Sequence, residues 1–133
     1  MEPLTLDAIQ AAFRDCWDLE TCDPHDIPYW TPTNPARGQC IVTALIVHDL
    51  FGGELLEAKV HVNGAHVGYH TWNRLAGGLD LDLTREQFDE TEIVGEPEVV
   101  PRISGEDMRL AAQYEILRTR LNQRLQDRAH GSL

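Results

Sequence analysis

The stretch from Cys40 to Phe51, CIVTALIVHDLF, is apolar on nearly every helical face. A helix that is apolar all round is stable only when other parts of the protein surround it. Gly52 and Gly53 follow directly, and glycine just after the last apolar turn is a typical helix stop. The sequence therefore predicts a buried helix over residues 40–51, around which the rest of the chain must pack.

Two further helices are predicted, one near each end of the chain. Residues 5–17 carry apolar side chains at helical spacing, and Ser104–Asp107 opens a second amphipathic helix. The apolar stripe of that last helix consists of Leu110, Tyr114, Leu117, Leu121 and Leu125. The proline-rich stretch from Trp17 to Gly38 predicts a long irregular connector, and loops of this length are often functional.

An antiparallel sheet is predicted after the buried helix. Apolar and polar residues alternate there, Asn63-Gly64 is a strong hairpin signal, and Gly77-Gly78 marks the next turn. The predicted strands are residues 55–62, 65–75 and 79–83, with an edge strand at Val94 and Val99–Val100.

This order of elements predicts an α+β fold, with the buried central helix packed on an antiparallel sheet of three to five strands and helices flanking it at both ends. A chain of 133 residues and 15.0 kDa buries roughly two-thirds of its unfolded surface, which is enough for one core. We therefore expect a single domain over residues 1–133, with its core at 5–128 and a frayed tail at 129–133.

The charge of the chain argues against several kinds of partner. Eleven Lys and Arg against twenty-two Asp and Glu leave a formal charge of −11. Such a surface repels nucleic-acid phosphates and anionic lipids. Residues 1–13 do not resemble a signal peptide, and no run approaches the roughly eighteen apolar residues of a membrane span. We expect a soluble cytoplasmic protein with no nucleic-acid or membrane partner.

The last predicted helix is basic on an otherwise acidic chain. Its arginines are Arg109, Arg118, Arg120, Arg124 and Arg128. This face is interpreted either as a solvated helix surface or as a surface for an acidic partner segment. The apolar stripe beside it either closes the core or pairs two copies, so both a monomer and a homodimer remain open.

Cys40 is the first candidate for chemistry, because it opens the buried helix directly after Gly38-Gln39. A thiol in the first turn of a helix lies at the positive end of the helix dipole, which favours the thiolate. The unpaired backbone N–H groups of that turn can hold the oxyanion of a tetrahedral intermediate. Gly38 allows close approach of the chain or of a substrate. The position suits a nucleophile.

His70 and Asp82 lie on neighbouring predicted strands. If the loop around Gly77-Gly78 holds an odd number of residues, positions 70, 80 and 82 share one face of the sheet. Asp82 then lies opposite His70 or one step diagonal to it, where it can accept the second ring proton. Asp80 has the same parity but lies farther away. An even-length loop places His70 and Asp82 on opposite faces.

Each of these residues also has a non-catalytic interpretation. Buried cysteine is commonly a small apolar residue, a histidine on a strand is often packing, and an aspartate before a helix is often a cap. Of the other two thiols, Cys16 is expected to pack the first helix, and Cys22 is expected in the long connector as an exposed or semi-exposed thiol.

The histidines permit a metal-site interpretation as well. His61, His66 and His70 fall within ten residues. Their spacing fits no compact zinc pattern, and the Asn63-Gly64 turn lies between the first two. We therefore expect neither a metal nor a cofactor.

Several motifs resemble those of the YunG-like bacterial proteins. The motifs span roughly residues 13–120: NPARGQCIVTAL at 34–45, DLFGG at 49–53, HTWNRL at 70–75, DLTREQF at 82–88, WDLET at 17–21 and QYEIL at 113–117. This chain has Thr71 where the family pattern usually has tyrosine after the histidine. The resemblance implies an architecture similar to the small papain-like or transglutaminase-like core.

That resemblance implies roles for several residues. Cys40 is the nucleophile, His70 the general base and acid, and Asp82 the group that orients the histidine. Gln39 and Asn73 are expected to form the oxyanion wall or to support the site from behind. A substrate groove is expected beside Gly38, bordered by Trp30 and Trp72; both tryptophans are alternatively core or lid packing.

The leading hypothesis is a cysteine-nucleophile acyl-transfer enzyme: a thiol hydrolase, amidase, peptidase or acyltransferase that passes through an acyl-thiol intermediate. Its substrate is a small molecule or a peptide. The alternative is a non-catalytic binding or accessory domain that keeps the same core for stability, and a histidine-cluster metal-binding protein is the third interpretation.

Overall fold

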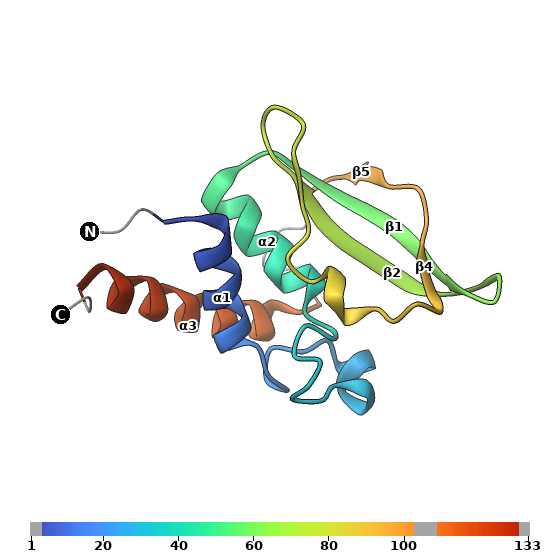
Figure 1. Ribbon diagram of the computed structural model, residues 1–133, viewed down its shortest axis with the longest axis horizontal. Helices are drawn as coiled ribbons and strands as arrows, with labels where there is room; N and C mark the ends of the chain where they lie inside the picture. The colour runs from blue at the N-terminus through green and yellow to red at the C-terminus, as the bar shows by residue number, and fades with distance from the viewer. Residues whose placement is uncertain (1–3, 103–108, 131–133) are drawn as a thin grey trace.

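The structure, a computed structural model, describes residues 4–102 and 109–130. Its helices and strands follow one another as the sequence predicts (Figure 1). They are α1 (Leu6–Cys16), the 3₁₀ helix η1 (Pro24–Tyr29), α2 (Cys40–Phe51), β1 (Glu54–Val62), β2 (Ala65–Arg74), β3 (Asp80–Leu81), the 3₁₀ helix η2 (Arg85–Gln87), β4 (Glu92–Val94), β5 (Glu98–Val100) and α3 (Ala111–His130). The α+β fold class is confirmed.

The strands form a curled five-stranded antiparallel sheet in the order β3-β2-β1-β4, with β5 also paired to β1. The β1–β2 hairpin turns at Asn63 and Gly64, whose φ angles of 51° and 80° are both positive, as a tight hairpin turn requires. Because β3 and β4 lie on opposite sides of the hairpin, residues 82–91 must cross one face of the sheet. We call residues 82–91 the crossing segment.

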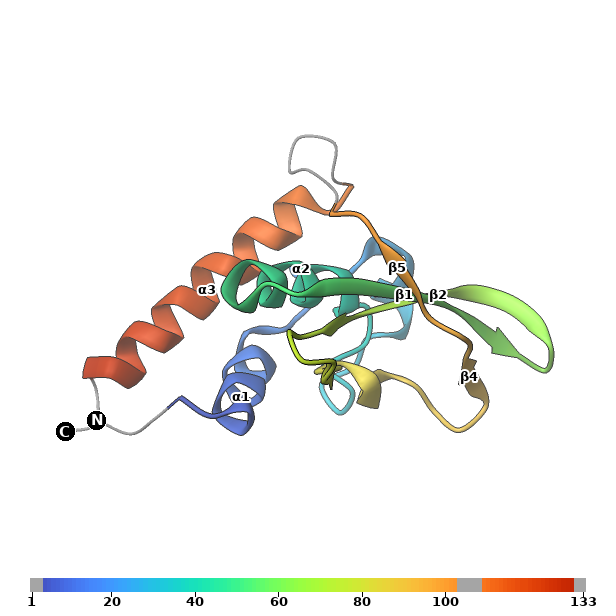
Figure 2. The same ribbon diagram turned by 90° about the horizontal axis from the view of Figure 1, so that it is seen from above.

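Helix α2 is buried, as its apolar pattern predicts. Val42, Ile46 and Val47 are fully enclosed, and the helix packs against β2, β1 and α3. Figure 2 shows the three α-helices gathered at one end of the molecule, while the tip of the β1–β2 hairpin extends at the other. Thr5 caps α1 by accepting a hydrogen bond from the Ala8 N–H at 3.1 Å.

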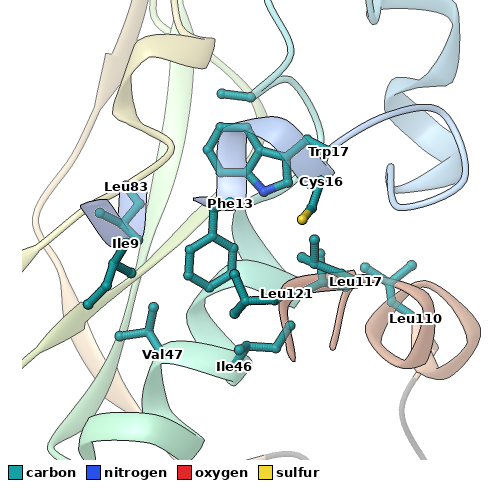
Figure 3. Close-up of a cluster of buried hydrophobic side chains, with 12 residues drawn as sticks. Ile9, Phe13, Cys16, Trp17, Ile46, Val47, Leu83, Leu110, Leu117 and Leu121 are labelled. Atoms are coloured by element: carbon teal, nitrogen blue, oxygen red, sulfur yellow. The ribbon is translucent and has the colours of Figure 1, made fainter. Parts of the chain in front are cut away.

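The main core lies where α1, α2 and α3 meet (Figure 3). The core includes four side chains that are fully buried: Phe13 from α1, Ile46 from α2, and Leu117 and Leu121 from α3. The stripe predicted on the last helix is thus the side that closes the core. Ser104–Asp107, the predicted start of this helix, lies outside the described residues, and α3 runs to His130, into the predicted tail.

The basic face of α3 is largely used within the molecule. Arg118 pairs with Asp49, and Arg120 pairs with both Asp18 and Glu20. Arg109, just before α3, pairs with Asp23 in the connector after α1. Acidic side chains of the same chain thus pair with three of the five arginines, while Arg124 is exposed, so the face is solvated in part. A surface for an acidic partner stays a prediction.

Within the part of the chain that the structure describes, no helix is both long and apolar enough to cross a bilayer.

Candidate active site

Cys40 is the first residue of α2 and is buried. The preceding Gln39 occupies the N-cap position but makes no side-chain cap hydrogen bond. The first N–H groups of an α-helix have no partner within the helix, so the backbone donors beside Cys40 remain uncapped by that side chain. The sulfur therefore lies next to a set of backbone donors at a helix start.

Burial decides the protonation of Cys40. Removal from water raises the pKa of its thiol to about 11, and a hydrogen bond from the Thr71 backbone acts in the opposite direction. The sequence predicts that the helix start favours the thiolate. That prediction is wrong for this resting state, because desolvation outweighs the local donors.

Gly38 holds a backbone conformation that other residues rarely adopt, with φ of 73°. A Cβ atom at this position would lie 2.5 Å from Sγ of Cys22 and 2.7 Å from Cβ of Asp26. The close approach that the sequence predicts at Gly38 is thus made by the connector of the same chain. Cys22 is fully buried, which corrects its expected place as a connector thiol with some exposure.

His70 and Asp82 are in direct contact. Nε2 of His70 lies 2.7 Å from Oδ2 of Asp82. Strand β3 pairs Asn73 with Leu81 and Arg74 with Asp80, so the paired positions sum to an even number, as the argument from an odd-length loop requires. The same register places Asp82 one step diagonal to His70 on one face of the sheet.

The ring of His70 is completely enclosed. Trp72 stacks on it with ring centroids 5.2 Å apart, and Phe88 of the crossing segment meets it edge-on at 4.8 Å. Since Nε2 faces a carboxylate, it carries the ring proton in the neutral imidazole, and Nδ1 then bears the lone pair. Nδ1 is the only buried side-chain nitrogen or oxygen without a hydrogen-bond partner among the described residues.

Asp82 is held in place from the crossing segment. Its Oδ2 accepts a hydrogen bond from Nε of Arg85 at 2.8 Å, and its Oδ1 accepts one from the Thr84 N–H at 3.3 Å. The Arg85 guanidinium also lies over the Trp72 ring, 5.3 Å from its centroid. The carboxylate is thereby fixed relative to the histidine that it contacts.

Thr71 connects the two halves of the site. It directly follows His70 on β2, and its backbone N–H faces the Cys40 sulfur. The start of α2 and the His70–Asp82 pair therefore meet at the same stretch of β2. Asn73, two residues along, donates from Nδ2 to the Ala44 carbonyl oxygen at 2.9 Å and fixes α2 against this strand.

A cavity of about 1210 Å³ opens beside Cys40. Cys40, Ile41, Gly38 and Thr71 line it on one side, and Phe88 and other residues of the crossing segment contribute to its described lining. His70 and Asp82 are not part of that lining, so of the three residues Cys40, His70 and Asp82 only Cys40 belongs to the described lining. The cavity is large enough for a drug-sized ligand or a short peptide.

The family of the chain follows from residues 5–126, which match the family model described as YunG protein. The chain belongs to the YunG family. It is 38% identical over 64 residues to the uncharacterized protein YunG of Bacillus subtilis (strain 168). That match covers 48% of this chain and 50% of the Bacillus protein, so it spans about half the length of either. No solved structure matches the chain.

In this YunG-family chain the side chain of Gln39 is used for internal bonding. Its Nε2 donates to the Asp18 and Arg37 carbonyl oxygens, and its Oε1 accepts from the Thr21 hydroxyl at 2.7 Å. Asn73 is likewise occupied by Ala44. Both residues support the site from behind, and neither side-chain amide lines the cavity as an oxyanion donor.

The two tryptophans expected at the groove lie elsewhere. Trp72 is buried against His70 and donates from Nε1 to Asp80 at 3.2 Å. Trp30 donates from Nε1 to the Pro35 carbonyl oxygen at 3.1 Å. Neither belongs to the described lining of the cavity, so of the three expected groove residues the structure brings only Gly38 to it.

The three histidines of the alternative metal-site interpretation do not converge. His61 pairs with His66 across the hairpin, beside a bulge at Val60, with ring centroids 5.7 Å apart. His70 faces Asp82 instead. Residues 4–102 and 109–130 contain no group of three or more His, Cys, Asp or Glu side chains placed to hold a metal ion.

Sequence reasoning missed Phe88 and the role of Arg85. Both belong to the DLTREQF motif, which also contains Asp82. The motif could have indicated them, because residues just after a strand that carries a site carboxylate are placed to support it.

Proposed function

We propose that this protein is a cysteine-nucleophile acyl-transfer enzyme that acts on an amide, thioester or isopeptide carbonyl. Cys40 is the nucleophile, His70 is the general base and acid, and Asp82 orients the histidine. The proposed arrangement is similar to that of papain-like and transglutaminase-like cores, in which a cysteine opens the central helix and a histidine and an aspartate follow on neighbouring strands.

The observation that carries the proposal is the unpartnered Nδ1 of His70. Buried polar atoms are nearly always hydrogen-bonded, so an exception calls for a functional explanation. With Nε2 held by Asp82, the free nitrogen is the one that can accept a proton. The Thr71 backbone, next in the chain to His70, reaches the Cys40 sulfur, so the start of α2 lies at the same stretch of β2 as the histidine.

The first half-reaction forms the acyl-enzyme. The Cys40 sulfur attacks the carbonyl carbon while its proton passes to Nδ1 of His70, and the carbonyl π electrons move to the oxygen. The uncapped backbone N–H groups of Cys40 and Ile41 are donors for this oxyanion. When the tetrahedral intermediate collapses, the bond to the leaving group breaks and that group takes the proton from His70.

The second half-reaction releases the acyl group. Water or an amine attacks the thioester carbon, and Nδ1 of His70 takes the proton of this nucleophile. Collapse returns the bonding electrons to sulfur, which regains the proton from His70. Water gives hydrolysis and an amine gives transfer, so one set of residues serves both outcomes.

The raised pKa of Cys40 determines the protonation state of the sulfur before substrate binds. A thiol with a pKa of about 11 is neutral at pH 7, so the resting sulfur is a thiol and not a thiolate. The proton must then move to His70 as the sulfur attacks. Catalysis in this form depends strictly on the histidine.

The second candidate function is a non-catalytic binding or accessory domain. The same burial of Cys40 favours it, because an enclosed thiol with a raised pKa also fits simple packing. In this case the cavity binds a ligand without forming a covalent bond to it. The two candidates differ in whether Cys40 takes up an acyl group.

We further propose a cytoplasmic protein that acts on a small molecule or a peptide, as a monomer or a homodimer. The charge of −11 disfavours nucleic-acid and anionic membrane partners.

p-Nitrophenyl acetate tests the proposed function. We expect the wild-type protein to gain one acetyl group, mapped by mass spectrometry to Cys40, and to release nitrophenolate. His70→Gln, checked for folding by circular dichroism, is expected to abolish this labelling, whereas His25→Gln, which changes an exposed histidine of the same cavity, is expected to keep it. Equal labelling and equal nitrophenolate release in the wild type and His70→Gln, or neither an acetyl group on Cys40 nor nitrophenolate release in the wild type, would contradict an acyl-transfer enzyme.

A further inference from the structure

The charges that line the Cys40 cavity do not balance. Six carboxylates and three arginines belong to its described lining. Each arginine is already paired: Arg14 with Glu86, Arg37 with Asp26 and Glu92, and Arg109 with Asp23. Within the described residues, Glu57 and Asp89 are the lining carboxylates that lack a cationic partner. The cavity therefore carries uncompensated negative charge.

Glu57 lies closest to the chemistry in the sheet register. It stands directly opposite Thr71, whose backbone N–H faces the Cys40 sulfur. Side chains at directly opposed positions have Cβ atoms about 5 Å apart. Lys59 lies two residues along on the same face of β1, but no ion pair joins it to Glu57 in the described part of the chain. The Glu57 carboxylate is half-buried and available to a ligand.

Asp89 adds a second charge at the cavity. Hydrogen bonds from the Thr91 hydroxyl and backbone hold the pKa of its carboxyl below the ordinary value of 3.8. The group is therefore ionised at neutral pH. It belongs to the crossing segment, whereas Glu57 belongs to β1, so a ligand in the cavity meets negative charge from two separate elements.

The outer edge of β2 is open along the same cavity. The Leu75 N–H donates to the Leu79 carbonyl at 2.8 Å, so the backbone groups of odd-numbered β2 residues point to the β3 side. Strand β3 pairs only with Asn73 and Arg74. In the described chain, no strand covers the outward backbone groups of Tyr69, which lines the cavity and is 55% exposed. Val67 also lines the cavity and is 58% exposed, and it lies at the register shift of the hairpin.

We infer that the substrate of Cys40 is a polypeptide that lies extended along the outer edge of β2 and places a lysine or arginine side chain against Glu57. The open edge supplies backbone donors and acceptors for an extended chain. The uncompensated carboxylate attracts a cationic side chain and repels an anionic one. This inference rests on the proposed function for the identity of the reacting sulfur.

The charge of Glu57 is expected to have a modest effect on the reaction rate. Half-exposed ion pairs contribute modestly, so we expect loss of the Glu57 charge to change a rate about twofold to fivefold. Salt screens such contacts, so the preference is expected to weaken at high ionic strength. A free amine has the same charge as a lysine side chain but cannot pair with the strand edge.

Three chloroacetyl probes separate these contributions. They are a valine-lysine-valine peptide, a valine-glutamate-valine peptide and 1,5-diaminopentane, each with one chloroacetyl group. In every case the sulfur of Cys40 displaces chloride: a carbon–sulfur bond forms, the carbon–chlorine bond breaks and the thiol proton is released. The rate of mass gain on Cys40 is measured by peptide mapping.

The expected order of rates is lysine peptide, then diaminopentane, then glutamate peptide. Glu57→Gln is expected to lower the ratio of the lysine rate to the glutamate rate about twofold to fivefold. The matched control is Glu54→Gln, which removes the same charge from the exposed start of the same strand, outside the described cavity lining, and is expected to leave the ratio unchanged.

Equal rates for the two peptides, or a ratio that Glu57→Gln does not change, would overturn the inference. Diaminopentane reacting as fast as the lysine peptide would overturn its polypeptide part, because charge alone would then suffice. Failure of the proposed function has a different signature: the lysine preference follows Glu57, but His70→Gln leaves the acetylation of Cys40 by p-nitrophenyl acetate unaffected.

Discussion

Nε2 of His70 lies 2.7 Å from Oδ2 of Asp82, and this contact fixes which ring nitrogen is free. A carboxylate accepts only, so the ring proton stays on Nε2 and the lone pair on Nδ1. An amide in place of the carboxylate can donate to Nε2 and so reverse the tautomer. In the proposed mechanism, the ability of His70 to take a proton on Nδ1 therefore depends on Asp82.

We predict that Asp82→Asn slows the acetylation of Cys40 by p-nitrophenyl acetate by about 10²-fold or more, because general base catalysis contributes an effect of this size. The rate is followed by mass spectrometry of Cys40. Asp80→Asn is the control: this exposed carboxylate pairs with Arg74, and its loss is expected to leave the rate unchanged. A rate in Asp82→Asn equal to that of the wild type is the contrary outcome.

Gly38→Ala is expected to destabilise the protein by about 1–3 kcal/mol, because it adds backbone strain and a steric clash. Its φ is 73°, and the new Cβ would lie 2.5 Å from the Cys22 sulfur. Urea denaturation measures the change. Gly68→Ala is the comparison, since nothing lies within 4 Å of its added Cβ, and it is expected to show no such loss.

The ion pair between Arg109 and Asp23 makes stability depend on pH. Burial raises the pKa of Asp23, but hydrogen bonds from Arg109 and the His25 backbone outweigh burial and lower it below 3.8. A carboxyl with a lowered pKa in the folded state stabilises the fold fully above its ordinary pKa. That contribution is lost as the pH falls through the lowered value.

We therefore expect Arg109→Gln to cost about 1 kcal/mol at pH 7, the upper range for a pair with one exposed partner. The difference in the free energy of unfolding between the wild type and Arg109→Gln should shrink as the pH falls below 3.8, the ordinary pKa of Asp23, because Asp23 becomes protonated in both proteins. Urea denaturation of both proteins at pH 7 and pH 2.5 checks this. A difference in the free energy of unfolding that is as large at pH 2.5 as at pH 7 contradicts it.

Gln39→Ala is expected to lower the free energy of unfolding by about 1–3 kcal/mol, because it removes the three hydrogen bonds of a buried side-chain amide. Thr21 loses an acceptor and the Asp18 carbonyl loses a donor. Gln123→Ala, an exposed glutamine on α3, is expected to change stability by less than about 0.5 kcal/mol. Equal effects of the two substitutions would show that Gln39 does not support the site as described.

Much of the fold could be predicted from local patterns. The apolar run of 40–51 permits only a buried helix, and the Asn63-Gly64 turn sets the hairpin register. The parity of the next loop then places Asp82 beside His70, which the structure confirms. These results follow from helix and strand periodicity, which a sequence displays directly.

The remainder of the site depends on contacts between distant segments. Phe88 covers His70 only because the crossing segment passes over one face of the sheet, and periodicity does not reveal that path. The pKa of Cys40 was also not predictable, because the effect of a helix start is local, whereas desolvation depends on every element packed around the sulfur. Gln39 is predicted as an oxyanion donor because it precedes Cys40, but in the folded chain the connector provides hydrogen-bond partners for its side chain, among them the Thr21 hydroxyl.

The pH dependence of Cys40 alkylation by iodoacetamide tests the central claim, that Nδ1 of His70 takes the thiol proton. In His70→Gln we expect the rate to rise about tenfold per pH unit from pH 7 to pH 10, as for an unassisted thiol with a pKa of about 11. In the wild type and in His25→Gln we expect a faster reaction at pH 7 and a shallower rise with pH, because a histidine that takes the thiol proton makes the rate depend less on hydroxide. Superimposable profiles for the wild type and His70→Gln would contradict the account.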